Sequence, residues 1–174
     1  MVPGLLQTPD YARTLIRLAH PAEPDSEITR RVEMRTRRQI LLTRKKPTNF
    51  DVILGESALR SAVGSRRIMD TQLRHLADAG TRTNISVRVL PFRAGVPLGD
   101  LTGPFTILDF PQPKRGVTAE PPVVYAEGYA GAMYFEDPDV VARYRQTHIA
   151  LGQVALSEQD SRQLLRDIAR EYAE

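Results

Sequence analysis

The stretch Phe50-Asp-Val-Ile-Leu-Gly-Glu-Ser-Ala-Leu-Arg60 decides the fold class together with three later apolar runs, Val87-Arg-Val-Leu-Pro-Phe92, Gly103-Pro-Phe-Thr-Ile-Leu-Asp-Phe-Pro111 and Val123-Val-Tyr-Ala-Glu127. Each run is short and rich in β-branched or aromatic residues, and Gly, Pro or Asn stands at its borders. Strands of a buried sheet have this composition. We therefore expect the runs to contribute strands to one buried sheet.

Helical patterns lie before, between and after these runs. Thr8 is a good N-cap before Pro9, and the helix that it begins should end near His20, before Pro21. Further helices are expected from Asp25 or Ser26 to Arg44, from Ile68 to Ala79, after Asp137-Pro138, and after the capping pattern Ser157-Glu-Gln-Asp160. On the helix after Pro138, the positions expected to be buried are Val140, Val141, Tyr144, Ile149 and Leu151.

The strands are expected at residues 50–54, 85–90, 105–110 and 123–129, with residues 55–60 as a turn into a loop. The last two strands should form an antiparallel hairpin. This order predicts an α+β fold with a single central mixed or antiparallel sheet of about four to five strands, flanked by two N-terminal and two C-terminal helices. The length of 174 residues suits one domain (1–174), divided into a helical N-terminal region (1–46), a sheet region (47–136) and C-terminal helices (137–174).

The composition excludes several classes of protein. The chain has no cysteine, which excludes disulfides and thiolate chemistry. No apolar run approaches the roughly 20 residues that span a bilayer, and the N-terminus lacks the basic and apolar regions of a secretory signal. We expect a cytoplasmic protein that does not enter a membrane.

No residue pattern identifies a reaction. Gly55-Glu-Ser57-Ala-Leu59 follows a strand, as a nucleophile elbow does, but Leu59 stands where that turn needs a glycine. His20, His75 and His148 have no spacing that would indicate a general base or a metal site. We expect no catalytic residue, no metal and no cofactor, and an enzyme is the less favoured class.

The segment Arg30–Lys46 carries most of the positive charge. Its eight basic residues and Glu33 give a net charge of +7, whereas the whole chain has +3, so that the remainder has −4. Three interpretations stay open: a solvated helix face whose arginine stems cover apolar surface, a contact with nucleic acid, and a contact with an acidic partner. The basic residues are Arg30, Arg31, Arg35, Arg37, Arg38, Arg44, Lys45 and Lys46.

Glu127 is a candidate ligand-binding residue, because it is a carboxylate within an apolar strand. Strand alternation places it on one face with Val123 and Tyr125. Glu56 could converge with it, and Arg60 or Arg88 could supply a counter-charge. A structural carboxylate in an internal ion pair is the alternative. The candidate pocket lies between this strand face and the loop from Gly95 to Gly103, and its residues are Glu56, Arg60, Arg88, Phe92, Tyr125 and Glu127.

The segment Val2-Pro-Gly-Leu-Leu-Gln-Thr-Pro-Asp-Tyr-Ala-Arg13 and the four apolar runs together resemble a domain of unknown function in actinobacterial regulators, including the WhiJ-like proteins. In those regulators the domain follows an XRE-type helix-turn-helix. The resemblance implies an effector domain in transcription regulation that binds a small molecule or a small protein encoded nearby. DNA would be contacted only through the helix-turn-helix, for which there is no room before Val2. We expect a piece of a longer regulator or a relative without that head.

Three hypotheses of function stay open. The first is a regulatory effector domain with a ligand or partner site around Tyr125 and Glu127. The second is a recruited biosynthetic enzyme that uses a cavity with one or two carboxylates. The third is a nonspecific nucleic-acid contact through residues 30–46, which should weaken steeply with salt. A homodimer is compatible with all three.

Overall fold

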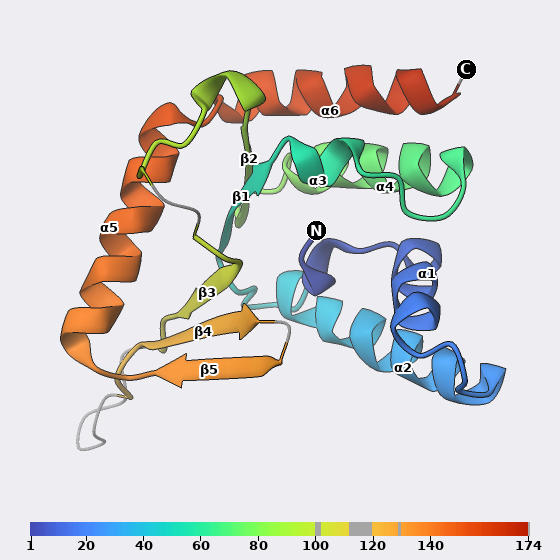
Figure 1. Ribbon diagram of the computed structural model, residues 1–174, viewed down its shortest axis with the longest axis horizontal. Coiled ribbons are helices and arrows are strands. Elements are labelled where there is room, and N and C mark those ends of the chain that lie inside the picture. The colour runs from blue at the N-terminus through green and yellow to red at the C-terminus, as the bar shows by residue number, and fades with distance from the viewer. Residues whose placement is uncertain (100–101, 112–119, 129, 174) are drawn as a thin grey trace. The chain divides into compact units, whose positions relative to one another are not determined.

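The computed structural model describes residues 1–99, 102–111, 120–128 and 130–173 (Figure 1). It confirms the α+β class, with helices and five strands in the described residues. Residue contacts divide the chain into two compact units, which we call unit 1 (Met1–Arg93 with Ala155–Glu174) and unit 2 (Ala94–Val154). Among the described residues, no helix has both the length and the apolar character needed to span a membrane.

The N-terminal part of unit 1 consists of η1 (Gly4–Leu6), α1 (Pro9–Ala19), α2 (Asp25–Arg37) and η2 (Arg38–Leu42), of which η1 and η2 are 3-10 helices. The helix predicted after Thr8 is confirmed as α1. Thr8 occupies the N-cap position, but its side chain makes no capping hydrogen bond. Its buried hydroxyl has no hydrogen-bond partner among the described residues. The N–H of Thr8 instead donates to the side chain of Gln72 at 2.7 Å.

The second helix is shorter than the sequence predicted. α2 begins at Asp25 as expected, but the regular helix ends at Arg37 and not at Arg44. The hydroxyl of Thr36 donates back to the carbonyl of Val32 at 2.9 Å, a local bond that competes with regular helix geometry. The chain continues as the tighter turn η2, whose last residue, Leu42, is only 4% exposed and belongs to the core.

The two strands of unit 1 are parallel neighbours. β1 (Phe50–Gly55) pairs with β2 (Ile85–Leu90), in a register that runs from Phe50 opposite Ile85 to Gly55 opposite Leu90. Parallel strands need a crossover connection, and here it consists of α3 (Ser57–Arg60) and α4 (Arg66–Ala79). The turn predicted for residues 55–60 thus contains a short helix. The helix predicted from Ile68 is confirmed and begins at Arg66.

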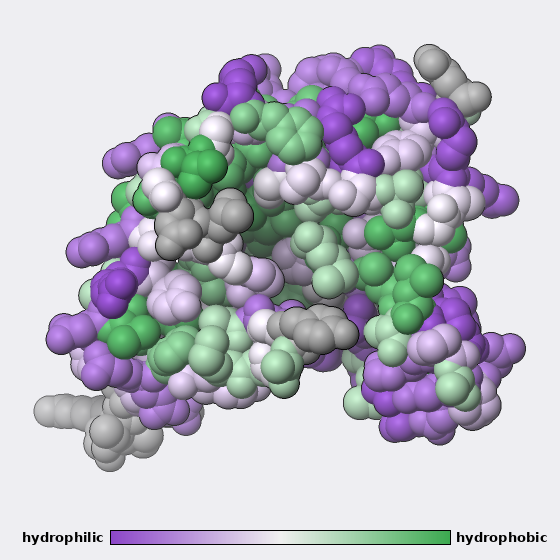
Figure 2. Space-filling view, in the orientation of Figure 1, coloured by the Kyte–Doolittle hydropathy of each residue, from purple (hydrophilic) through white to green (hydrophobic). Residues whose placement is uncertain are grey.

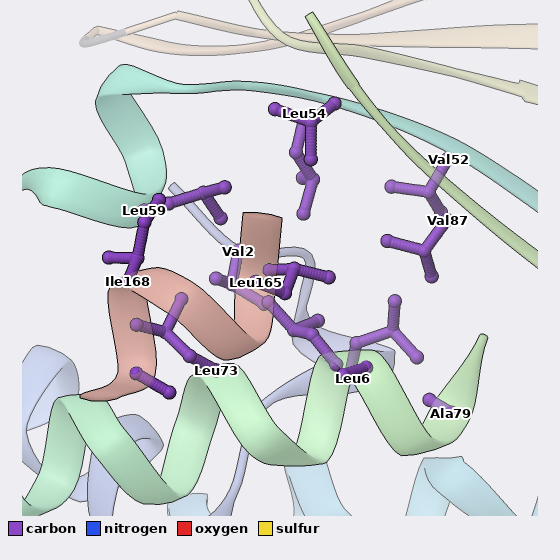
Figure 3. Close-up of a cluster of buried hydrophobic side chains, with 14 of the residues drawn as sticks. Val2, Leu6, Val52, Leu54, Leu59, Leu73, Ala79, Val87, Leu165 and Ile168 are labelled. Atoms are coloured by element: carbon purple, nitrogen blue, oxygen red, sulfur yellow. The ribbon is translucent and has the colours of Figure 1, made fainter. Parts of the chain in front are cut away.

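The core of unit 1 lies between the buried face of this strand pair and the helices α4 and α6 (Glu158–Ala173). In Figure 3, side chains from β1, β2, α4 and α6 point into one cluster, which the N-terminal Val2 and Leu6 also join. The hydroxyl of Ser161 in α6 accepts the N–H of Val89 in β2 at 2.9 Å. Ser157 caps α6 as predicted, since its hydroxyl accepts the N–H of Asp160 at 3.1 Å.

Unit 2 is an antiparallel sheet with one helix. The sheet has the strand order β3 (Phe105–Leu108), β4 (Val123–Gly128), β5 (Gly131–Phe135), and α5 (Pro138–Val154) follows it. The predicted antiparallel hairpin is confirmed as β3 and β4. The strand β5 was not predicted from the sequence, because its residues from Gly131 to Tyr134 are exposed and do not alternate between apolar and polar.

The predicted buried side of α5 is wrong at one end. Val141 is 3% exposed and packs inward, and the ring of Tyr144 lies 4.9 Å from that of Phe105. Ile149, which was expected to be buried, is 60% exposed. The sheet of unit 2 is small, so the later turns of the 17-residue helix α5 have less of the sheet to pack against.

The strands form two sheets where the sequence predicted a single central one. The parallel pair β1–β2 and the antiparallel sheet β3–β4–β5 share no ladder. Pro91 cannot donate to a ladder, and the 3-10 turn η3 (Phe92–Ala94) follows it, so the next strand does not extend the ladder of β2. The three successive regions predicted from sequence are also grouped differently, because α6 packs on α4 in unit 1 whereas α5 belongs to unit 2.

Candidate functional site

The carboxylate of Glu56 lies at the carboxyl end of β1 and is bonded within unit 1. One oxygen accepts the backbone N–H of Phe92 at 2.9 Å, and the other accepts Nε of Arg60 at 2.8 Å. The Glu56 side chain is only 12% exposed. The hydrogen bond from Phe92, and then the bond from Arg60, hold the pKa of this carboxyl below its usual value, although burial opposes them. This geometry supports the interpretation of Glu56 as a structural carboxylate in an internal ion pair, and not as a ligand-binding residue.

Arg60 links this carboxylate to α6. Its Nη1 lies 3.0 Å from a carboxylate oxygen of Glu171, and its carbonyl accepts the hydroxyl of Tyr172 at 3.0 Å. The bond to Glu56 raises the pKa of the Arg60 guanidinium above its usual value. A hollow of about 240 Å³ lies beside this network, lined by Arg60, Arg66, Ile168, Glu171 and Tyr172.

The structure brings together only part of the predicted site within unit 1. Glu56 and Arg60 are in contact, and Phe92 joins them through its backbone N–H while its ring is 60% exposed. Arg88 stands opposite Ile53 in the strand register, and its guanidinium lies 3.5 Å from the carboxylate of Asp51. Arg88 therefore has a charge partner on the neighbouring strand.

Tyr125 and Glu127 lie in unit 2, on the face of β4 that the alternation predicted. Val124 and Ala126 point to the buried side, at 0% and 8% exposure, while Glu127 is exposed. The ring of Tyr125 packs against that of Tyr134 on β5, with centroids 5.2 Å apart. Among the described residues, the carboxylate of Glu127 has no hydrogen-bond or ion-pair partner. Its backbone N–H donates to the carbonyl of Pro104 at 3.2 Å.

This side of the sheet, which we call the open face, carries apolar and aromatic groups. Tyr134 is 67% exposed, and Leu108 is 42% exposed opposite the half-buried Val123. Figure 2 shows green residues mixed with white and purple ones over β4 and β5. In the strand register, each residue of the open face lies opposite another residue of the same face. The open face comprises Thr106, Leu108, Val123, Tyr125, Glu127, Ala132 and Tyr134.

The strand β5 is also an edge of the described sheet. It pairs with β4 on one side, and no described strand pairs with its other side. An edge strand presents backbone donors and acceptors that can pair with an added strand from another chain. The exposed residues of β5 therefore place a backbone edge directly beside the open face.

The basic segment of residues 30–46 divides into neutralised and free cations. Arg30 pairs with Glu27 and Arg31 with Glu23, each at 2.7 Å. Arg31 lowers the pKa of the Glu23 carboxyl. Two further arginines bond to neutral oxygens, at 2.8 Å from Arg35 to Gln7 and 3.3 Å from Arg44 to Thr48. Among the described residues, no ion-pair partner faces Arg37, Arg38, Lys45 and Lys46, which are all exposed.

A second hollow in unit 1 was not predicted from the sequence. It measures about 470 Å³ and lies at the amino ends of β1 and β2, where its lining includes Phe50, Asp51, Arg82, Asn84, Glu158 and Arg162. Arg162 donates to the carbonyl of Gly80 at 3.1 Å, and Asn84 donates to those of Leu42 and Thr48. The only sequence signal was the polar run Thr81-Arg-Thr-Asn84 after α4, and the other lining residues come from distant parts of the chain.

Within the described part of the chain, no hydrogen bond or ion pair joins Ser57, His20 and His75 to one another. Ser57 is exposed at the start of α3, and His75 is half-buried in α4, where burial, assisted by Arg82, lowers the pKa of its imidazole. His20 lies 3.5 Å from a carboxylate oxygen of Glu23. Within the described ranges, no group of three or more His, Cys, Asp or Glu side chains could hold a metal ion.

The family whose sequence profile matches the chain is described as a domain of unknown function, DUF5753, and the match covers residues 1–167. The searches of curated proteins and of solved structures found no match.

Proposed function

The chain belongs to the DUF5753 family, and we propose that it is an effector domain in transcription regulation that binds a small partner protein on the open face of unit 2. The proposal includes the features implied by the resemblance to actinobacterial regulators: association with an XRE-type helix-turn-helix, which would make the contact with DNA, and a location in the cytoplasm. The partner would be a small protein encoded beside the regulator.

The observation that carries this proposal is the aromatic pair formed by the half-buried Tyr125 and the exposed Tyr134. Soluble proteins expose single apolar side chains freely, whereas apolar residues grouped on one face mark interaction sites. Tyrosine is enriched at the centres of protein interfaces, because it buries a large ring and keeps a hydroxyl available for hydrogen bonds. Leu108 and Val123 extend the apolar area next to the pair.

A protein partner fits this site better than a small molecule does. Small-molecule sites are concave and enclose most of the ligand surface. The two hollows described above are in unit 1, and neither includes Tyr125 or Glu127. The carboxylate of Glu56, which the pocket hypothesis needed, is occupied by Phe92 and Arg60.

The surroundings of the aromatic pair indicate the chemistry of the partner. Glu127 lies at the rim of the open face with an exposed carboxylate, which favours a basic side chain on the partner. The backbone edge of β5 would allow the partner to add a strand, so that main-chain hydrogen bonds supplement the apolar contact. We therefore propose a partner with an apolar or aromatic centre, a nearby cation and an extended segment.

The proposal is tested by calorimetric titration of the full chain with the small protein encoded beside its gene. Tyr134→Ala should weaken binding by about fivefold or more, since truncating an aromatic residue at the centre of an interface typically costs over 1 kcal/mol. Glu127→Gln should weaken it less and reduce its dependence on salt.

The matched control is Leu18→Ala, which truncates a side chain that is 70% exposed in α1 of unit 1. It should leave the affinity within about twofold of the unmodified chain. The proposal is wrong if the neighbouring protein does not bind, or if Tyr134→Ala changes the affinity no more than Leu18→Ala does.

A further inference from the structure

We infer that unit 1 carries a second docking surface, for an acidic protein segment with apolar side chains. This basic surface consists of Met34, Arg37, Arg38, Ile40, Lys45 and Lys46, at the end of α2, in η2 and in the turn that follows. The inference does not rest on the proposed function, because the open face lies in the other unit and shares no residue with this surface.

Uncompensated charge is the first observation. Arg30 and Arg31, about two turns earlier in the same segment, are neutralised by Glu27 and Glu23. Among the described residues, the four cations of the basic surface have no such partner. Glu33, the one acid in the segment, leaves the local net charge at +7 while the rest of the chain has −4.

Exposed apolar side chains among these cations are the second observation. Met34 is 58% exposed and Ile40 is 62% exposed. Ile28, Val32 and Leu42 already form the buried side of α2 and η2, and each of them is at most 5% exposed. The Sδ of Met34 accepts a weak hydrogen bond from Nη1 of Arg30 at 3.7 Å. Neither Met34 nor Ile40 belongs to the buried clusters of unit 1, so both side chains remain available at the surface.

The segment is held in place, so its side chains are presented on a fixed backbone. Gln39 donates to the carbonyl of Gln7 at 2.6 Å, and the N–H of Thr48 donates to the carbonyl of Leu41 at 2.8 Å. Asn84, at the entry to β2, donates to the carbonyl of Leu42 at 3.2 Å. A preorganised surface loses less conformational entropy on binding than a flexible one does.

The helix dipole explains only part of this charge. Basic residues in a last turn stabilise a helix, which suffices for Arg37. Lys45 and Lys46 lie beyond η2 and outside the reach of that effect, which falls off within one turn. Their charge is therefore available to an external partner.

The combination favours protein over nucleic acid. Nonspecific nucleic-acid binding depends on cations that contact phosphates, and exposed Met34 and Ile40 add nothing to it. An amphipathic acidic segment would use both kinds of group, with carboxylates on the cations and apolar side chains on the methionine and isoleucine.

Fluorescence anisotropy with three labelled probes tests the inference on the full chain. The first probe is a synthetic peptide with glutamate and leucine at helical spacing, the second has glutamine in place of glutamate, and the third is a random-sequence DNA duplex. The Glu/Leu peptide should bind more tightly than either of the others. Equal or tighter binding of the Gln/Leu peptide or of the duplex, or no binding of the Glu/Leu peptide, would overturn the inference.

Two variants of the chain locate the surface. The first variant changes four cations together to Gln: Arg37, Arg38, Lys45 and Lys46. It should weaken binding of the Glu/Leu peptide by about tenfold or more, because each exposed ion pair contributes a modest amount and four are removed. The second variant changes Met34 and Ile40 together to Gln. It should weaken binding of the Glu/Leu peptide by about threefold or more, while binding of an all-glutamate peptide stays unchanged.

A control with the same loss of charge distinguishes a local surface from net charge. It changes four exposed arginines outside the surface to Gln, namely Arg67, Arg82, Arg143 and Arg166. Binding of the Glu/Leu peptide should stay within about threefold of the unmodified chain, because screening limits distant charges to a small effect. A loss as large as that caused by the surface variant would overturn the inference.

Discussion

The carboxylate of Glu56 accepts the backbone N–H of Phe92 at 2.9 Å, which fastens the end of β1 to the turn after β2. Glu56→Gln keeps an acceptor oxygen but removes the charge that strengthens this bond and the bond from Arg60. We expect it to lower the free energy of unfolding by about 1–2 kcal/mol in urea titrations. Glu171→Gln, at a side chain that is 59% exposed, should cost less than about 0.5 kcal/mol. Equal losses in the two variants would contradict the structural role of Glu56.

The same contact predicts a dependence of stability on pH. Because Phe92 and Arg60 lower the pKa of Glu56 in the folded state, its contribution is complete above the carboxyl pKa of the unfolded chain, about 4.3, and is lost as the pH falls through the lower folded value. The difference in unfolding free energy between the unmodified chain and Glu56→Gln should therefore be constant from pH 7 to about 5 and shrink below about 4. A difference that grows on acidification would contradict this assignment.

Gln72 connects α4 to the N-terminal segment through both ends of its buried amide. Its oxygen accepts the N–H of Thr8 at 2.7 Å and its nitrogen donates to the carbonyl of Leu6 at 2.8 Å. Gln72→Leu would leave two backbone groups without partners, and we expect a loss of about 2–4 kcal/mol in unfolding free energy. Gln163→Leu makes the same replacement at an exposed position bonded to Asp167, and should cost less than about 0.5 kcal/mol. Similar losses would show that the buried amide does not hold the N-terminal segment.

Two apolar residues of α5 should differ sharply in their effect on stability. Val141 is 3% exposed, and Val141→Ala should lower the unfolding free energy by about 1–2 kcal/mol through lost burial and a small cavity. Ile149 is 60% exposed, and Ile149→Ala should stay within about 0.5 kcal/mol. Thermal unfolding of both variants measures the difference, and a larger loss for Ile149→Ala would contradict the orientation of α5.

Most strands could be predicted because the exposure of their residues alternates along the strand. β1 and β2 alternate between core and outer face, and β3 and β4 carry β-branched and aromatic residues between glycines and prolines. The strand β5 could not be predicted this way, since its exposed residues give no alternation to detect. The prediction that Ile149 is buried was wrong. Helical periodicity identifies one side of α5, but it does not show how far the neighbouring sheet extends along the helix. The end of α2 at Arg37 is not marked by a glycine or a proline, so composition does not reveal it.

The candidate site could be predicted only in part, for a different reason. Alternation correctly placed Tyr125 and Glu127 on one face of β4. It could not supply Tyr134, because this residue lies on the strand that was missed. The ion pair of Glu56 and Arg60 follows from their separation of four residues in a helical turn, but the bond from Phe92 depends on the parallel register of two strands far apart in sequence.

Hydrogen exchange of the full chain, measured with and without the small protein encoded beside its gene, tests the proposed docking on the open face most directly. We predict that the partner slows amide exchange in β4 (Val123–Gly128) and β5 (Gly131–Phe135), while exchange in β2 (Ile85–Leu90) stays unchanged. Slower exchange confined to unit 1, or unchanged exchange in β4 and β5 at saturating partner, would contradict the proposed function.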